Sequence, residues 1–464
     1  MSSTNHPVEQ MNPTEIRATF GLSLVFAFRM LGMFMVLPVM AIYGQSLQGA
    51  TPVLIGLAVG AYGYTQALLQ IPLGIISDRV GRLPIILIGL LLFLLGSIVA
   101  AMSDTIWGVL IGRVLQGTGA ISAVVMALLS DLTREQHRTK AMAFIGMSIG
   151  ASFAIAMIAG PILASYFGLH GLFWFIAVMA AIGFLLMAFV VPRPNKQISR
   201  RDASVAKSDF LPTLKDLDLF RLDFSIAAVH IVMMVNFMAL PIVLVNESGL
   251  PKEQHWWVYL VAFVGSAFGM IPMIIYGEKK RRLHQVLITC VVILLLCSLF
   301  FLLHHPSLWA LLAGILVFFI AFNTIEALLP SMVSKVAKAG ARGTAMGIFS
   351  TSQFLGAGIG ASLSGVLIKF GGLPAVFIGS CVICIIWLLV ILKMKEPPYV
   401  TSIRLALTSD QLANQQLVPY LMQQTGISDA LVALDESAIY VKVDKKLIKA
   451  DQLQTLIASA PKNL

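Results

Sequence analysis

The chain has 464 residues, of which 58% are hydrophobic and only 12% are charged. Soluble domains are about 25% charged, so a single soluble protein of this composition would have too little polar surface to cover itself. The formal net charge is +10, but the basic residues gather in short loops between apolar blocks, which indicates membrane topology and not nucleic-acid binding.

Apolar blocks of roughly 20 residues follow one another along most of the chain. At about 1.5 Å rise per residue, such a block crosses about 30 Å of hydrocarbon as one helix. Many blocks are apolar on every side, so we expect the lipid bilayer to surround them. The predicted spans, twelve in all, are residues 18–43, 53–76, 84–102, 105–129, 140–166, 171–191, 220–246, 255–276, 284–303, 307–330, 343–368 and 373–392.

The basic residues of the loops predict the orientation of the chain. Loops after even-numbered spans hold 18 Lys and Arg residues, whereas loops after odd-numbered spans hold only Lys252 and Lys369. Because positively charged loops stay on the cytoplasmic side, the even loops and both termini are predicted to be cytoplasmic.

A polar stretch divides the spans into two groups of six. Residues 192–219 form the longest polar connection and separate a bundle in residues 1–191 from one in residues 220–395. An Ala-Leu-Leu segment ends span 4 and span 10, at residues 127–129 and 327–329, which favours an internal duplication. Two parallel repeats place a substrate site at their interface near the middle of the membrane.

The loop after the second span carries a recognisable motif. Residues 74–82 read Gly-Ile-Ile-Ser-Asp-Arg-Val-Gly-Arg. They resemble the signature loop of the major facilitator superfamily, G-x-L-x-D-R-x-G-R, with Ile76 where leucine is commonest. Span 4 carries Arg113-x-x-Gln116-Gly117, which is similar to the R-x-x-Q-G motif of the family.

Span 5 carries a further partial match, Gly160-Pro161, which resembles the antiporter motif of drug:proton exporters. The resemblance covers about residues 15–395. It implies an all-α polytopic membrane protein with two pseudo-symmetric halves of six helices each. It also implies a secondary transporter of small solutes in the bacterial inner membrane, acting as a proton-coupled exporter by alternating access.

By the same resemblance, the signature loop clamps the two halves in the outward-facing state. The alternative is that the loop is a static topology anchor. Its glycines are expected to allow close helix approach and a tight turn. The expected switch residues are Gly74, Asp78, Arg79, Gly81, Arg82 and Asp131.

Polar side chains inside spans are costly and mark functional candidates. Arg29 and Arg113 have no acid close by in the sequence, which favours an anionic substrate; alternatively, they hydrogen-bond backbone carbonyls and hold helices together. Related proton-coupled exporters usually carry an acidic residue in span 1, where this chain has Arg29. The candidate cavity residues are Arg29, Arg113, Gln116, Asn236, Asn323 and Glu326.

Glu326 is the one clear carboxylate inside a predicted span, one turn from the cytoplasmic end of span 10. A low dielectric favours the protonated form of a carboxylate, so Glu326 is a candidate proton site. Asn323 is predicted to share its helix face. The alternative is that Glu326 pairs with a basic loop residue. His230 is placed near the end of span 7 and is expected to be structural.

Residues 396–464 differ in composition and predict a small soluble domain on the cytoplasmic side. The diproline Pro397-Pro398 stops the last span. The expected elements are strands at 400–408, 429–435 and 438–443, and helices at 410–424, capped by Ser409 or Asp410, and 451–459. The order βαββα resembles a ferredoxin-like fold without its last strand. By resemblance the domain regulates transport or binds an unknown cytoplasmic ligand or partner.

Three function classes are weighed. The leading one is secondary transport of a small molecule; the alternative is a non-transporting receptor that signals through the C-terminal domain. An enzyme is not expected, because no nucleophile–base pair or metal-ligand spacing is evident in the soluble parts. We also expect no cofactor, no metal and no nucleic acid; the C-terminal domain contains neither Cys nor His.

Overall fold

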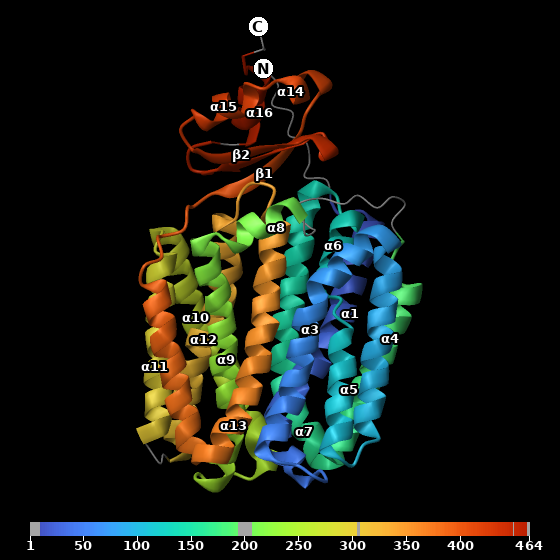
Figure 1. Ribbon diagram of the computed structural model, residues 1–464, viewed down its shortest axis with the longest axis vertical. Helices are drawn as coiled ribbons and strands as arrows, with labels where there is room; N and C mark the ends of the chain where they lie inside the picture. The colour runs from blue at the N-terminus through green and yellow to red at the C-terminus, as the bar shows by residue number, and fades with distance from the viewer. Residues whose placement is uncertain (1–9, 194–206, 304–306, 449, 462–464) are drawn as a thin grey trace.

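The computed structural model describes residues 10–193, 207–303, 307–448 and 450–461. Within these residues, ten helices are long and apolar enough to cross a membrane. Figure 1 shows them standing roughly parallel as one bundle, with a small sheet-containing domain at one end. The first half contains α1 (Pro13–Met35), α2 (Leu37–Tyr43), η1 (Gly44–Ser46), α3 (Pro52–Val80), α4 (Arg82–Ala101), α5 (Ile106–Thr118), α6 (Ser122–Leu132) and α7 (Glu135–Phe189).

The second half repeats this pattern after the short connecting helix α8 (Lys207–Leu214). Its elements are α9 (Leu217–Asn246), η2 (Lys252–Gln254), α10 (His255–Lys280), α11 (Leu283–Leu303), α12 (Leu308–Val336) and α13 (Arg342–Ile391).

Two of the long helices each contain a pair of predicted spans. α7 has 55 residues and α13 has 50. A straight helix of 50 residues is about 75 Å long, more than twice the hydrocarbon thickness. Each helix contains a glycine with non-helical dihedral angles, Gly168 (φ 66°, ψ −170°) and Gly372 (φ 65°, ψ −162°). These angles are accessible to glycine and allow the chain to change direction.

Helices α3 and α13 pack against each other where the two halves meet (Figure 1). Glycines on both helices bring the backbones together. A Cβ atom on Gly60 would lie 2.5 Å from the carbonyl oxygen of Gly358, and one on Gly63 would lie 2.6 Å from that of Phe354. The α3 glycines involved lie in the N-terminal part of that helix. The halves are therefore tightly closed at the end away from the sheet.

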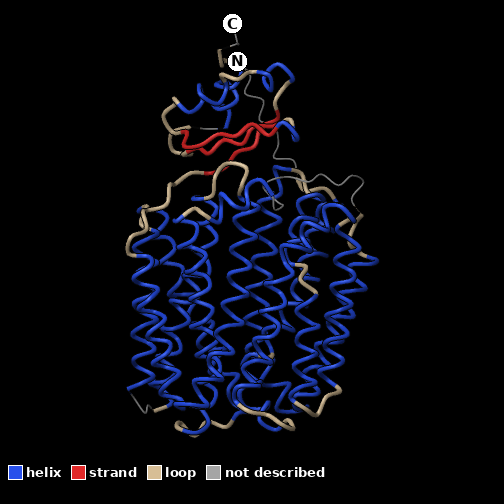
Figure 2. Tube along the Cα trace, in the orientation of Figure 1, coloured by secondary structure: helices blue, strands red, loops and turns tan. Residues whose placement is uncertain are grey.

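The C-terminal domain consists of a three-stranded antiparallel sheet with short helices on one face (Figure 2). The strand order is β1-β3-β2. Leu417, Val441 and Leu453 are among the side chains of its apolar core. The elements are β1 (Thr401–Ala406), α14 (Ser409–Ala413), α15 (Leu417–Met422), β2 (Ile427–Ala433), η3 (Leu434–Glu436), β3 (Ala438–Val443) and α16 (Ala450–Ala458).

The single helix predicted for residues 410–424 is wrong. The chain forms two short helices, because Asn414 is extended (φ −79°, ψ 99°) and ends the first one. The predicted cap is also one position late: Thr408 caps α14, and its backbone N–H donates to Gln411 Oε1 at 3.0 Å. This reciprocal arrangement is a capping box.

Candidate functional site

The signature loop lies between α3 and α4. Gly81 has φ +114°, a turn conformation that glycine adopts without strain. Arg82 is buried and forms ion pairs with Asp78 (Nη2 to Oδ1, 3.3 Å) and with Asp131 at the end of α6 (Nε to Oδ2, 2.6 Å). The loop thus ties three helix ends together within the first half. Arg79 is exposed.

The expected close approach at Gly74 is not present. A Cβ atom there would meet nothing within 4 Å, and Ile76 and Val80 on the same end of α3 are exposed. The tight contact between α3 and α13 lies instead at the other end of α3. The signature loop therefore makes its ion pairs without clamping α3 against α13 at Gly74.

The second half has a related arrangement 200 residues later. Glu278 occupies the position of Asp78 and pairs with Lys335 (Nζ to Oε1, 2.7 Å). Ser331, at the position of Asp131, donates to the same carboxylate at 3.2 Å. Arg281 takes the place of Gly81 and is also left-handed, with φ 54°. Both positions have positive φ, but the turns differ in ψ, which is 142° at Gly81 and 49° at Arg281.

The two buried arginines of the first half lie close to one aromatic ring. Arg29 and Arg113 are each 1% exposed, and their guanidinium carbons lie 5.9 and 4.9 Å from the ring centre of Tyr62. Arg29 donates to Ser122 Oγ at 2.9 Å and to Gln66. Arg113 donates to Gln116 Oε1 at 2.8 Å and to the carbonyl oxygen of Val59 at 3.4 Å.

These contacts agree in part with the alternative that both arginines hydrogen-bond backbone carbonyls and hold helices together, because only Arg113 has a carbonyl acceptor. Arg29 connects α1 with α3 and α6, and Arg113 connects α5 with α3. We call Arg29, Arg113 and Tyr62 the arginine cluster. Neither arginine has an ion pair with a carboxylate in the described part of the chain.

Three amides expected in the cavity form hydrogen bonds between neighbouring helices. Gln116 is fully buried and donates to Ser97 Oγ on α4 at 2.8 Å. Asn236 donates to Ser380 Oγ at 3.2 Å, within the packing of the second half. Asn323 donates to Ser266 Oγ on α10 at 2.8 Å and does not join Glu326. Each amide donates to a serine on a neighbouring helix, and a role for the three residues in a shared cavity stays a prediction.

Glu326 lies farther from the end of its helix than predicted. Helix α12 continues to Val336, so Glu326 is about 15 Å from its end and not one turn from it. Its Oε1 lies 3.4 Å from Nδ1 of His230, and its Oε2 accepts from Gln353 Nε2 at 3.5 Å. The Glu326 side chain is 30% exposed. It faces other buried helices and not a loop, so the predicted pairing with a basic loop residue is not seen.

His230 is the residue that sequence reasoning misplaced most. It lies in the middle of α9, which runs from Leu217 to Asn246. Its Nδ1 donates to the carbonyl oxygen of Ile226 at 3.0 Å, and its Nε2 lies 3.0 Å from Nε2 of Gln353. The amide therefore donates to a neutral ring. We call Glu326, His230 and Gln353 the Glu326 cluster.

An aromatic cluster lies beside the Glu326 cluster and connects the two halves. Phe153 of α7 packs within 5.1 Å of Phe263 and 6.2 Å of Phe322, measured between ring centres. Phe322 in turn lies 6.2 Å from the ring of His230. Phe153 also packs 4.7 Å from Phe34 of α1. A side chain of one half is thus inserted among aromatic side chains of the other.

The Gly160-Pro161 motif lies where α7 passes the end of α1. A Cβ atom on Gly160 would lie 2.7 Å from the carbonyl oxygen of Met35. Met35 is the last residue of α1, and α2 begins at Leu37. The glycine therefore lets the α7 backbone approach this break in the first span closely.

The comparison with known sequences decides the family. The model described as Major Facilitator Superfamily matches residues 22–220 and 222–433. The chain is 47% identical over 451 residues to the Inner membrane transport protein YajR of Escherichia coli strain K12, covering 97% of this chain and 99% of the relative. The chain belongs to the major facilitator superfamily. It is a multi-pass membrane transporter.

Two further comparisons give lower identities. The chain is 28% identical to the Multidrug resistance protein MdtH of Yersinia enterocolitica, over 71% of this chain and 81% of that protein. Its fold is similar to that of a bacterial homologue of the human lysosomal transporter Spinster in an inward-facing and occupied conformation. That similarity has a TM-score of 0.66 at 14% identity, and covers 82% of this chain and 97% of the other.

The C-terminal domain of this major facilitator protein docks on its second half. Lys442 of β3 is 4% exposed and donates to the carbonyl oxygens of Lys335 (2.7 Å) and Ser334 (3.3 Å) in the last turn of α12. Asp429 of β2 accepts from the backbone N–H of Ala339 at 2.8 Å. These contacts give hydrogen-bond partners to carbonyl oxygens at the C-terminal end of α12 and to a backbone N–H in the loop that follows it.

An ion pair and the connecting segment complete this interface. Arg281 pairs with Asp444 (Nη2 to Oδ2, 2.8 Å). Hydrogen bonds from the Lys446 backbone N–H and from Arg281 lower the pKa of Asp444. Tyr399 donates to Glu396 Oε1 at 2.8 Å, and burial raises the pKa of its hydroxyl. Glu396 also accepts from the backbone N–H of Leu283 at the start of α11, at 2.6 Å.

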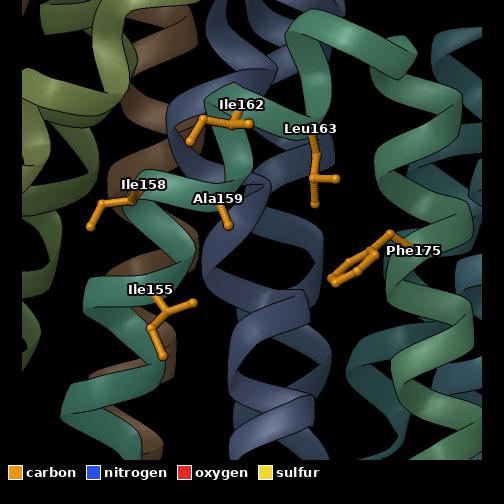
Figure 3. A pocket seen from close by; sticks show the side chains of 6 residues that line it. All are labelled: Ile155, Ile158, Ala159, Ile162, Leu163 and Phe175. Atoms are coloured by element: carbon orange, nitrogen blue, oxygen red, sulfur yellow. The ribbon is translucent and has the colours of Figure 1, made fainter.

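One apolar pocket lies along α7 (Figure 3). Ile155 and Phe175 mark its two sides, and Ile155 is 52% exposed. No polar atom is present to fix a solute, so the pocket does not have the character of a specific site. Its lining residues are Ile155, Ile158, Ala159, Ile162, Leu163 and Phe175.

Proposed function

We propose that this chain is a proton-coupled exporter of small solutes that works by alternating access. The observation that carries the proposal is the Glu326 cluster: a carboxylate deep within a membrane helix, beside a neutral histidine, next to an aromatic cluster formed by both halves. A carboxylate in such a place is a functional candidate by default, because an isolated charge there is costly.

The cluster offers a route for one proton. Neutral His230 accepts from the Gln353 amide through Nε2, whereas protonated His230 would donate from that atom. The amide would then have to turn its oxygen towards the ring and withdraw its N–H from Glu326. Proton binding at the cluster therefore changes contacts between α9, α12 and α13. Such a change between helices is what couples a proton to a conformational equilibrium.

The close packing of α3 on α13 supports a conformation closed to the outside. The proposed cycle opens this contact and closes the opposite end. The Arg82 ion pairs of the signature loop are proposed to be the switchable cluster that stabilises one of the two states. Asp131 and Asp78 compete for the same guanidinium, so a small shift of α6 or α3 would redistribute the pairing.

The proposed topology has twelve crossings with both termini in the cytoplasm. Each of α7 and α13 would cross twice, turning at Gly168 and Gly372. The basic loops support this orientation. The relative from Escherichia coli is named an inner membrane transport protein, which supports the same location here. The relative named a multidrug resistance protein supports export of drug-like solutes.

For the C-terminal domain we propose a regulatory role within the transporter. Its βαββα order resembles a ferredoxin-like fold, and the sheet order β1-β3-β2 is compatible with that fold lacking an edge strand. The domain contacts the end of α12, the helix that carries Glu326. A receptor could signal to the C-terminal domain through the same contact, so a non-transporting receptor is the competing proposal.

The proposal is tested by proton flux in proteoliposomes that contain a pH-sensitive dye. Three probes cover the charge classes: ethidium as a cation, benzoate as an anion and chloramphenicol as a neutral solute. We expect at least one probe to drive a proton flux with the wild-type protein. Glu326→Gln should abolish that proton flux and leave exchange of the probe, because glutamine keeps the size and cannot release a proton.

Glu253→Gln, in the exposed segment η2, is the matched control and should behave as wild type. An unchanged probe-driven proton flux in Glu326→Gln would contradict the coupling role. Absence of flux with every probe, together with ligand-dependent exposure of the C-terminal domain, would favour the receptor.

A further inference from the structure

The arginine cluster carries two positive charges without a counter-charge. Arg29 and Arg113 are both 1% exposed, and their hydrogen-bond acceptors are neutral: Ser122, Gln66, Gln116 and a backbone carbonyl. In the described residues no carboxylate forms an ion pair with either guanidinium. Buried charges in proteins are normally paired, because desolvation is otherwise uncompensated.

The aromatic rings do not replace the missing charge. Tyr62 is approached by both guanidinium groups, at 5.9 and 4.9 Å, and Phe93 lies 5.9 Å from that of Arg29. Such contacts stabilise a cation by the ring quadrupole, which is weaker than a full negative charge. They do position both arginines around one ring.

Unused donors belong to the same three side chains. Nε of Arg29, Nε of Arg113 and the hydroxyl of Tyr62 are buried and have no hydrogen-bond partner. Buried donors are satisfied in the large majority of cases. Three unsatisfied donors therefore belong to one tyrosine and to two cationic side chains within 5.9 Å of its ring centre, and they match the requirements of an anion.

We propose that Arg29, Arg113 and Tyr62 bind one monovalent anionic group. Two sources share this chemistry: a small inorganic anion such as chloride, or the carboxylate of a transported solute. The second source rests on the proposed transport function, and the first does not. This site lies in the first half, whereas the Glu326 cluster lies in the second, so proton and anion would bind on opposite halves.

Access to the site is controlled by the contact between the halves. The ring of Tyr62 packs 6.4 Å from that of Phe354 on α13, and Tyr64 donates to Ser362 Oγ at 3.2 Å. Separation of α3 from α13 would remove Phe354 from Tyr62 and uncover the arginines beneath. The anion would therefore enter or leave when the halves open at this end.

The test is thermal unfolding of the purified full-length protein, followed by tryptophan fluorescence at constant ionic strength. Gluconate, which is large and strongly hydrated, is replaced stepwise by chloride, nitrate or benzoate. We expect a saturable rise of the unfolding temperature by about 2 °C or more in the wild type. Arg29→Gln and Arg113→Gln should lose the rise, whereas Arg193→Gln, at an exposed position, should keep it.

Tyr62→Phe covers the case in which the arginine variants do not fold. It keeps both charges and removes one donor, so the anion concentration at half-saturation should increase. A response to chloride and nitrate alone indicates an inorganic anion, and a response to benzoate at lower concentration indicates a carboxylate of the cargo. The same unfolding temperature in all four salts, or the same salt response in wild type and arginine variants, would overturn the proposal. This readout needs no transport, so it is independent of the proton-flux experiment.

Discussion

Removing the ammonium group of Lys442 should release the C-terminal domain from the membrane bundle. Lys442→Met keeps most of the buried stem but leaves the carbonyl oxygens of Lys335 and Ser334 without this donor. A hydrogen bond to a charged group contributes about 1.5–3 kcal/mol, and the cation also favours the negative end of the helix. We expect the docking to weaken by about 2–3 kcal/mol in total, given the 4% exposure of the side chain.

Such a loss increases the open population by roughly 30- to 140-fold, at about 1.4 kcal/mol for each factor of ten. Hydrogen–deuterium exchange of residues 337–341 measures it directly, because the Ala339 amide is protected by Asp429 only in the docked state. Lys445→Met, at an exposed lysine of the same domain, should leave exchange unchanged. Equal exchange in Lys442→Met and wild type would refute the reasoning that this lysine holds the interface.

Three further results are expected. Gly60→Leu should reduce transport at least about tenfold, because its Cβ would lie 2.5 Å from the carbonyl oxygen of Gly358 and prevent closure of the outer end. Asp131→Asn should destabilise the protein by about 3 kcal/mol in chemical unfolding, because it breaks the 2.6 Å pair and leaves buried Arg82 undercompensated. The pKa of Asp444 is lowered in the folded state. Its contribution to docking stability is therefore present above its unfolded pKa of about 3.9 and is lost as the pH falls through the folded value. Hydrogen–deuterium exchange at the docking interface should accelerate only in that acidic range.

Controls separate these outcomes from general misfolding. Gly183→Leu is the matched glycine change, since a Cβ there meets nothing within 4 Å; equal loss of transport in both glycine variants would contradict the role of the α3–α13 contact. Asp410→Asn, on an exposed carboxylate, should not change stability. For Asp444, the neutral Asp444→Asn variant should show fast exchange already at neutral pH, and acid acceleration equal to that of wild type would exclude this carboxylate as the cause.

The family and the membrane class could be predicted because each depends on local sequence, whereas Asp131, 49 residues from Arg82, was expected only from the family resemblance. Hydrophobic length predicts the spans, and residues 74–82 carry their motif in one stretch. Deviations at Gly168 and Gly372 were also visible as breaks between predicted spans. The hydrophobic pattern does not show whether a helix continues beyond its apolar block.

Helix continuation explains the error at Glu326 but not the one at His230. Helix α12 extends six residues past the predicted span, to Val336, so Glu326 lies farther from the helix end than hydropathy indicated. Helix α9 begins at Leu217, only three residues before the predicted span, so His230 was already inside that span and its description as a residue near the span end was wrong. Residue pairing between distant helices could not be predicted either. The contacts of Gln353 with His230, and of Phe153 with Phe322, join segments more than a hundred residues apart and depend on tertiary packing alone.

The measurement that tests the central claim most directly is the distance between the two halves at their outer end as a function of pH. Spin labels at Ser46 and Asn246, both exposed, would be introduced in a variant whose four native cysteines are replaced, and measured by double electron–electron resonance. We predict a short and a long distance whose proportions change between acidic and alkaline buffer in the wild type and stay fixed in Glu326→Gln. A single distance at every pH, or the same pH response in Glu326→Gln, would contradict proton-coupled alternating access.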